Sequence, residues 1–203
     1  MEIIRYAELK AQPWRNGGGV TRELRRHPAD GGPDGGWDWR ISIADVSKAG
    51  GFSVFPGMDR VLTVIEGELL LLSVDGAEHP LEKYRPFRFS GDADSTGKLP
   101  TGDIRDLNVI TRTGAFKGYT SIIELSKKRA HPVFEGQLGI LLQGQATAGT
   151  EEAAPGAGSP AQETRTELGR YDAVVGSDSA TPDVLGRGFL AVVSIDRIAG
   201  PLA

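Results

Sequence analysis

Short stretches in which apolar and polar residues alternate recur along this chain, and most of them end at Gly, Pro, Asp or Ser. In residues 37–46, Ile41 and Ile43 fall on one face of an extended strand, whereas Arg40 and Ser42 fall on the other. Comparable stretches occupy residues 60–74, 84–91, 107–112 and 119–125. The 28 glycines and 12 prolines supply the turns between them. The pattern predicts an all-β sandwich or barrel.

The chain also resembles itself at a spacing of about 80 residues, a period that indicates a structural repeat. Residues 62–71 are echoed by residues 138–147, residues 81–92 by 168–178, and residues 107–112 by 189–197. The three matches occur in the same order. They predict two copies of one β motif, with chance similarity between β sequences as the alternative.

Composition excludes several classes of protein. The 203 residues contain no cysteine, which excludes disulfides, thiolate zinc sites, iron–sulfur clusters and cysteine nucleophiles. The net charge of −4, with both signs mixed, argues against nucleic acid as a partner. The longest apolar run, residues 69–72, is too short to cross a bilayer, and the N-terminus lacks the apolar core of a signal peptide. We therefore expect a cytoplasmic protein without a membrane partner.

Two segments have the composition of loops. Residues 148–166 contain no aromatic and no large aliphatic side chain, so they cannot bury enough apolar surface to offset their ordering entropy. We predict a flexible loop there, inside the second copy of the repeat. The glycine-rich residues 31–36 are predicted to form a second loop.

Residues 12–23, QPWRNGGGVTRE, form the least common segment of the chain. Gly17, Gly18 and Gly19 allow the backbone to approach a ligand closely, and their N–H groups can turn toward one anion. Trp14 could supply a wall, while the neighbouring Arg15 and Asn16 side chains could donate hydrogen bonds. A plain turn remains the alternative, because glycine is common in turns.

Two further strands carry polar side chains that need explaining. Asp106, Asn108 and Arg112 share one face of the strand at residues 103–112, which otherwise reads as an interior strand. Asp59 and Arg60 open another strand, where they could form an ion pair with each other at the surface or face a cavity. Such side chains must either meet water, as in a half-solvated sheet, or line a polar cavity. Arg40 and Ser42 present the same choice on their strand.

Taken together, PWRNGGGVTRE, WRISIADV, FSVFPGMDRVLTVIEGE, PFRFSGD and DLNVITR resemble the HutD/Ves family of bacterial proteins across about residues 8–125. The resemblance implies a bicupin, which is two antiparallel jelly-roll barrels formed by one chain. We expect the first jelly roll at residues 1–125, including the N-terminal glycine-rich segment. A second, degenerate jelly roll is expected at residues 126–203. Cupins often dimerise, so the resemblance is compatible with a homodimer.

The resemblance also allows a test for a metal site. Metal-binding cupins carry His-X-His and a Glu before a glycine, and alignment on Gly67 places those positions at Ser53, Phe55 and Arg60. Phenylalanine has no lone pair, and arginine is a fixed cation with no acceptor. The chain's three histidines lie far apart. We therefore expect no metal and no other cofactor.

The resulting hypothesis is a metal-free cupin that binds a small carboxylate metabolite, because the planar fork of arginine suits a carboxylate. The family's association with histidine utilisation implies a formylglutamate-like ligand and a regulatory or accessory role. Arg60 and Arg112 would hold the acid. The expected binding residues are Trp14, Arg15, Asn16, Gly17, Gly18, Gly19, Arg40, Ser42, Phe55, Asp59, Arg60, Asp106, Asn108 and Arg112.

The alternative is a metal-independent isomerase or lyase of a small organic acid, with Asp59 or Asp106 as general base. A nearby arginine lowers the pKa of a carboxyl group and makes it a poorer base near pH 7, so binding without catalysis is preferred. A pKa raised well above the ordinary value at either aspartate would favour the enzyme. A third hypothesis, a partner docking on residues 148–166, suffers from the lack of an apolar anchor there.

Overall fold

The computed structural model describes residues 1–30, 36–150 and 165–198. Within these ranges the chain forms strands β1 to β17 and a single turn of 3-10 helix, η1 (Tyr6–Glu8). The prediction of an all-β jelly-roll fold is confirmed. The loops predicted at residues 31–36 and 148–166 fall mostly on residues 31–35 and 151–164, which lie outside the described residues. The ends of the loop predicted at residues 148–166 are strand instead, because residues 148–150 belong to β14 and Thr166 begins β15.

The chain divides into two compact units. The larger unit contains Leu9–Thr120 and the residues from Ile195 onward, and the smaller unit contains Met1–Glu8 and Ser121–Ser194. The division falls inside two strands, β12 (Phe116–Leu125) and β17 (Pro182–Arg197). The first eight residues therefore belong with the second half of the chain.

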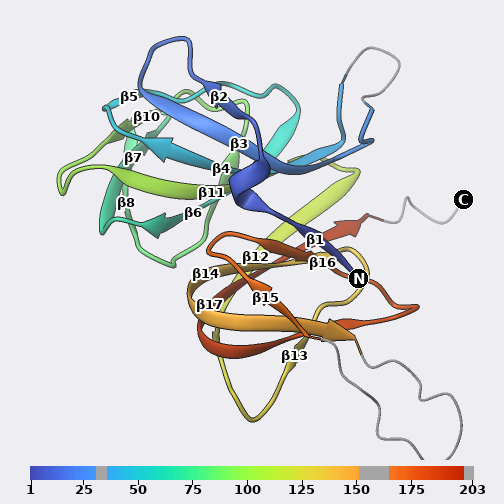
Figure 1. The fold of residues 1–203 in the computed structure, drawn as a ribbon. Helices are drawn as coiled ribbons and strands as arrows, with labels where there is room; N and C mark the ends of the chain where they lie inside the picture. Colours follow the sequence, from blue (N-terminus) through green and yellow to red (C-terminus); the bar gives the residue numbers. More distant parts are fainter. Residues whose placement is uncertain (31–35, 151–164, 199–203) are drawn as a thin grey trace, which may run out of the picture. The chain divides into compact units, whose positions relative to one another are not determined.

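Two antiparallel sheets build the larger unit, as Figure 1 shows. The six-stranded sheet has the order β2 (Ala11–Pro13), β3 (Gly19–His27), β4 (Trp39–Val46), β11 (Ile104–Arg112), β6 (Met58–Glu66), β9 (Phe87–Ser90). The four-stranded sheet has the order β5 (Gly50–Gly51), β10 (Ser95–Lys98), β7 (Leu69–Val74), β8 (Ala77–Glu82). Gly67, with a φ of 83°, makes the turn between β6 and β7.

The central strands of the larger sheet are buried on both faces. Leu62 and Val64 of β6 pack with Leu70 and Leu72 of β7 in the core of the unit. Side chains on the opposite face, such as Ile43, are also fully buried. Alternation therefore separates two kinds of side chain on these strands, but it does not separate a buried face from a solvent-exposed face, because both faces are buried. The face that carries polar residues is the one that also contributes to the core between the sheets.

Register brings the polar residues of three strands into adjacent rows. On β11, Asn108 lies opposite Ser42 of β4 and Leu62 of β6. One step along the same face, Ile110 lies between Arg40 and Arg60. In the other direction, the neighbours of Asp106 are alanine and valine. The result is a polar patch at one end of an apolar interior.

The smaller unit is built on a seven-stranded sheet with the path β1-β16-β14-β17-β12. Its strands are β1 (Glu2–Ile4), β13 (His131–Pro132), β14 (Gln137–Thr150), β15 (Thr166–Leu168) and β16 (Ala173–Val175), together with parts of β12 and β17. Its core includes Leu141, Val174, Val184 and Leu190, all almost completely buried. β14 is interrupted by a bulge that follows Leu141.

The order of strands in the two units agrees with the internal repeat. In the larger unit β9, β6, β11 and β4 are neighbours in that order, and in the smaller unit β16, β14, β17 and β12 have the same order. The three sequence matches relate β6 to β14, β9 to β16 and β11 to β17. β4 and β12 occupy the next position in each sheet, although no sequence match relates them. The repeat read from the sequence therefore corresponds to a repeated sheet topology.

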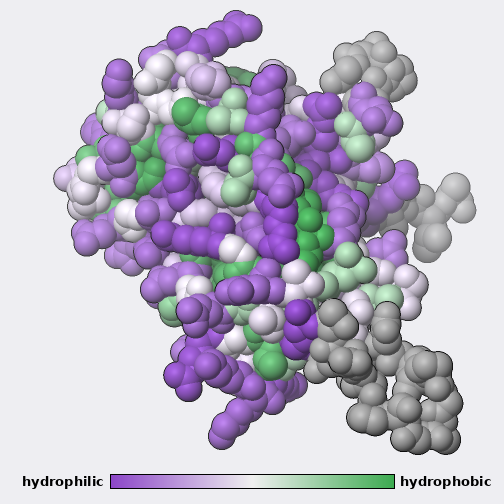
Figure 2. Space-filling view, viewed as in Figure 1, coloured by the Kyte–Doolittle hydropathy of each residue, from purple (hydrophilic) through white to green (hydrophobic). Residues whose placement is uncertain are grey.

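The N-terminal strand is anchored in the smaller unit, where β1 pairs with β16. Arg5 forms an ion pair of 2.6 Å with Asp172, which is 5% exposed, and the backbone N–H of Tyr6 donates to the same carboxylate. Across the described residues, no helix has the length and apolarity that crossing a membrane requires. Hydrophilic side chains predominate on the face of the molecule shown in Figure 2.

Candidate functional site

A cavity of about 380 Å³ opens in the larger unit where the polar patch of the six-stranded sheet ends. Eight of the residues expected from the sequence line it: Trp14, Arg15, Asn16, Arg40, Ser42, Phe55, Arg60 and Asn108. They come from the β2–β3 hairpin, from β4, β6 and β11, and from the loop between β5 and β6. The exposure of the lining differs along the cavity, because Arg60 is 3% exposed whereas Arg15 and Asn16 are exposed at the rim.

Arg60 is the buried cation of this cavity. One terminal nitrogen donates to Oδ1 of Asn108 at 2.9 Å, and the other donates to the carbonyl oxygen of Ser53 at 3.2 Å. The rings of Phe52, Phe55 and Phe89 surround the guanidinium, with centroids 4.9–5.7 Å away. Burial lowers the pKa of Arg60 to about 10, partly offset by Asp106, so the group remains charged at neutral pH.

Arg40 supplies a second cation at the same cavity. Its guanidinium lies 4.8 Å from the ring of Trp37 and 5.3 Å from that of Phe55. Burial lowers its pKa as well, while Glu23 acts in the opposite direction. The Nε atoms of Arg40 and Arg60 are both buried without a hydrogen-bond partner. Within the described part of the chain, the ion pairs closer than 4 Å include neither arginine.

Asp106 lies behind Asn108 and does not line the cavity. It is fully buried, its Oδ1 accepts a hydrogen bond from the amide of Asn108, and its Oδ2 has no partner. Burial raises the pKa of Asp106 to about 7, although Arg60 lowers it, and Asp45 raises it further. The sequence argument expected a nearby arginine to dominate, but removal from water is the larger effect.

The glycine-rich segment positions Trp14. The β2–β3 hairpin turns through Gly17, whose φ is 64°. The backbone N–H of Gly17 donates to the carbonyl oxygen of Trp14. The N–H of Gly18 donates to Oδ1 of Asn16, so neither amide is left for an anion. A Cβ on Gly19 would lie 2.5 Å from the backbone oxygen of Asp45 and 3.1 Å from the Trp14 ring. These glycines shape the wall and do not line the cavity.

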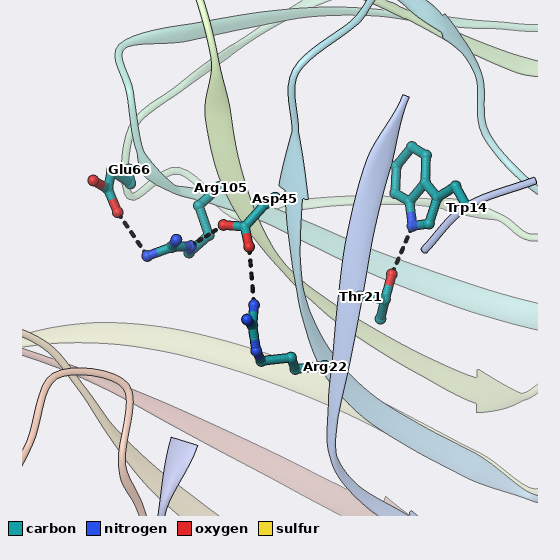
Figure 3. Close-up of polar contacts among 6 residues, drawn as sticks. All are labelled: Trp14, Thr21, Arg22, Asp45, Glu66 and Arg105. Carbon is teal, nitrogen blue, oxygen red and sulfur yellow. Dashed lines mark hydrogen bonds and ion pairs between the residues drawn. The ribbon is translucent and has the colours of Figure 1, made fainter. Parts of the chain in front are cut away.

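Figure 3 shows how Trp14 is fixed and what lies on the opposite face of β3. The indole N–H of Trp14 donates to the hydroxyl of Thr21 at 2.7 Å. Alternation turns the next residue, Arg22, to the other face, where a chain of ion pairs forms. Asp45 joins Arg22 to Arg105, and Arg105 continues to Glu66. This chain is separate from the cavity, although its Asp45 contributes to the raised pKa of Asp106.

Comparison with known proteins decides the family. The HutD family model matches residues 6–192. The chain belongs to the HutD family. It is 41% identical over 111 residues to an uncharacterised 21.2 kDa protein from the hutC 3′ region of Pseudomonas putida, covering 54% of this chain and 57% of that one. It is 36% identical over 126 residues to protein Ves of Citrobacter koseri, covering 61% and 64%. The chain thus aligns with less than two thirds of the length of each curated relative.

Two solved structures extend the similarity over the whole fold. HutD from Pseudomonas fluorescens SBW25 is 28% identical with a TM-score of 0.75, covering 98% of this chain and 99% of that one. A conserved protein of unknown function from Pseudomonas aeruginosa PAO1 is 28% identical with a TM-score of 0.77 and the same coverage. A cupin 2 conserved barrel domain protein from Leptotrichia buccalis, 7% identical over 97% of this chain and 96% of that one, has a TM-score of 0.57 and shows the cupin fold alone.

Two charged residues expected at the site of this HutD family member lie elsewhere. Arg112, at the end of β11, is exposed and pairs with Asp38 at 2.7 Å. Asp59 precedes Arg60 on β6, so its side chain is on the opposite face of the sheet. Neither lines the cavity. The proposed pair of acid-holding arginines therefore becomes Arg60 and Arg40.

Sequence reasoning missed seven residues that line the cavity: Pro13, Thr21, Ala44, Gly51, Phe52, Ser53 and Ile110. Alternation could have found Ala44 and Ile110, because each lies two residues along its strand from an expected site residue. Thr21 could follow from hairpin pairing, since Gln12↔Thr21 places it opposite β2, which directly precedes Trp14. Phe52 and Ser53 lie in an irregular loop, for which the sequence gives no periodic signal.

The residues at the metal positions of the cupin fold do not fit a metal ion in this HutD family member. Arg60 places a fixed cation inside the cavity, and Phe55 presents only a hydrocarbon ring. Ser53 uses its carbonyl oxygen to accept from Arg60. In the described ranges, His, Cys, Asp and Glu form no group of three that could hold a metal.

Proposed function

We propose that the cavity binds a small carboxylate metabolite and that the protein has a regulatory or accessory role in histidine utilisation. A formylglutamate-like acid is the expected ligand. The observation that carries the proposal is Arg60, a nearly fully buried cation whose two hydrogen-bond acceptors are neutral oxygens.

A buried charge without a directly bound counter-ion is costly, and an anion in the cavity would relieve that cost. Arginine holds a carboxylate through two parallel, charge-assisted hydrogen bonds. Arg40 stands beside Arg60 across the side chain of Ile110, so a second acidic group would also find a cation. Trp14 and Phe55 supply apolar walls for the carbon skeleton.

The histidine-utilisation part of the proposal is supported by the family and by the name of one relative, which places that Pseudomonas putida protein in the hutC 3′ region. The volume of the cavity, about 380 Å³, suits a metabolite rather than a macromolecule.

The test is isothermal titration calorimetry of the purified protein with N-formyl-L-glutamate, urocanate, L-glutamate and L-histidine. We expect binding of at least one acid, and weakening by at least about tenfold in Arg60→Met, because a charged hydrogen bond contributes about 1.5–3 kcal/mol. Methionine retains most of the side-chain volume. Arg85→Ala, an exposed arginine in the same unit, is the control and should bind as the wild type does. Absence of heat with all four compounds, or equal binding by Arg60→Met, would contradict the proposal.

The second candidate function is a metal-independent isomerase or lyase, favoured by one observation. Burial raises the pKa of Asp106 to about 7, which is the range that a general base needs. Its position argues for binding instead, because Asp106 is fully buried behind Asn108 and outside the cavity lining. Incubation with the same acids in D₂O, followed by NMR, would reveal catalysis as deuterium exchange at carbon that is lost in Asp106→Asn.

A further inference from the structure

The floor of the cavity continues into a buried chain of three polar side chains. Arg60 donates to Oδ1 of Asn108, and the amide nitrogen of Asn108 donates to Oδ1 of Asp106. One amide thus connects the guanidinium that faces the cavity to a carboxyl group that water does not reach. The second oxygen of that carboxyl group, Oδ2, is buried without a partner.

We propose that Asp106 is a proton-binding site coupled to the cavity, so that a carboxylate entering the cavity is bound together with one proton. The inference rests on the proposed function, because it requires an anion beside Arg60. The reason is electrostatic. An ionised Asp106 already opposes part of the positive charge of Arg60. A ligand carboxylate adds a second negative charge at the same guanidinium, and protonation of Asp106 removes the conflict.

The other charged groups around Asp106 leave this coupling intact. From β6, Arg60 is the nearby cation, and from β4, Arg40 acts on Arg60 while Asp45 adds negative potential from the opposite face. The sheet across the core faces this region with leucines such as Leu70 and Leu72. Arg60 keeps its charge throughout the neutral range, since its pKa falls only to about 10. Asp106, whose pKa is about 7, therefore titrates in a range where Arg60 stays charged.

The size of the effect follows from the raised pKa of Asp106, about 7 in the protein without ligand. If binding requires the neutral form, the apparent dissociation constant rises about tenfold between pH 6 and pH 8. The carboxyl groups of a small acid are fully ionised across this range, so the charge of the probe stays constant.

The experiment measures the binding of N-formyl-L-glutamate and of acetate by calorimetry at pH 6 and pH 8. We expect the wild type to bind about tenfold more tightly at pH 6. Asp106→Asn, which mimics the neutral carboxyl group, should bind at both pH values with the affinity that the wild type has at pH 6. Asp94→Asn, the same change at an exposed position, should retain the tenfold dependence of the wild type.

A second measurement needs no variant. At pH 7, titrations in phosphate and in Tris, whose ionisation enthalpies differ, should report uptake of about half a proton per bound probe. Binding by the wild type with equal affinity at both pH values and no proton uptake would overturn the coupling and leave the proposed function standing. A tenfold dependence that persists in Asp106→Asn would also overturn it. Failure of both acids to bind at either pH would overturn the proposed function and the coupling together.

Discussion

Asp106 illustrates how far a residue's position along a strand changes its chemistry. It shares a face of β11 with Asn108, yet only Asn108 reaches the cavity. The two aspartates considered from the sequence therefore differ completely, because Asp106 is fully buried and Asp59 is partly exposed on the other face of the sheet. The face of the sheet separates Asp59 from Asp106, and depth along the barrel, which the sequence does not encode in a periodic pattern, separates the buried Asp106 from Asn108 at the cavity.

The raised pKa of Asp106 predicts how stability depends on pH. The ordinary pKa of an aspartate, about 4, applies to the unfolded chain, whereas the folded protein has a value of about 7. Between these values the folded state binds more protons, so the free energy of unfolding falls as the pH rises. Relative to Asp106→Asn, the wild type should lose about 3 kcal/mol between pH 5 and pH 8. Urea unfolding of both proteins at the two pH values checks this, and parallel curves would contradict it.

The arginines also show that alternation along a strand does not by itself predict which side chains reach the cavity. Alternation left open whether Arg40 faces water or a cavity, and Arg60 could equally have paired with Asp59 at the surface; in the structure both arginines line the cavity. Alternation put Arg112 on the same face of its strand as Asn108, but Arg112 is at the very end of β11, where it is exposed and pairs with Asp38. We expect Arg112→Ala to leave carboxylate affinity within about twofold of the wild type in calorimetry. A loss comparable with that of Arg60→Met would restore Arg112 to the site.

At the scale of elements, the β2–β3 hairpin explains why three consecutive glycines precede β3. Gly17 has the positive φ of the turn, Gly18 is buried beside Asn16, and Gly19 lies against Trp14 and the backbone of β4. The sequence correctly indicated close approach of this backbone to something. It could not distinguish a ligand from the protein's own indole ring, because both require the same absence of a side chain.

The hairpin provides a matched pair of glycine substitutions. Gly19→Ala would place Cβ 2.5 Å from a backbone oxygen, so the strands must separate, at a cost of about 1–3 kcal/mol. Gly17→Ala meets no atom within 4 Å and suffers only the strain of its positive φ, about 1 kcal/mol. Thermal unfolding measures both, and near-UV circular dichroism should change only for Gly19→Ala, because only that change displaces Trp14. Equal effects on the dichroism would contradict this account.

Strand limits were less predictable than strand existence. Residues 37–46 were predicted as one strand, and β4 occupies Trp39–Val46 of it. Residues 148–150, which composition assigned to a loop, continue β14 because the ladder with β17 extends to Thr150. Small residues such as Ala148 and Gly149 carry no strand signal of their own. Their conformation is fixed by pairing with a strand more than thirty residues away along the chain.

At the scale of the whole molecule, the repeat was visible in the sequence, but the pairing of the N-terminal strand β1 with the sheet of the second copy was not. The strands that match in sequence occupy equivalent places in the two sheets. Nothing in residues 2–4 indicates that they complete the sheet of the second copy, because three residues are too short for a periodic signal. The pairing depends on Arg5 and the buried Asp172, which are brought together only by the fold.

Removal of residues 1–8 should therefore act on one unit. The truncation removes Arg5, the ion-pair partner of the buried Asp172, and it exposes the edge of β16. Removing one partner of a buried ion pair is strongly destabilising, because the remaining charge is left uncompensated. We expect hydrogen exchange to accelerate in peptides that cover residues 168–176, with β4, β6 and β11 unchanged. The single variant Arg5→Ala should show a smaller change in the same peptides. Uniform acceleration across both units would contradict this division.

The pairing of β1 with β16 also bears on the order of events during translation. Arg5 leaves the ribosome 167 residues ahead of its partner Asp172. The strands of the larger unit, apart from its C-terminal residues, are synthesised in between and can pair as they emerge, since domains fold as units during synthesis. β1 therefore stays without its partner strand while the larger unit is synthesised, and it can pair only after β16 has emerged.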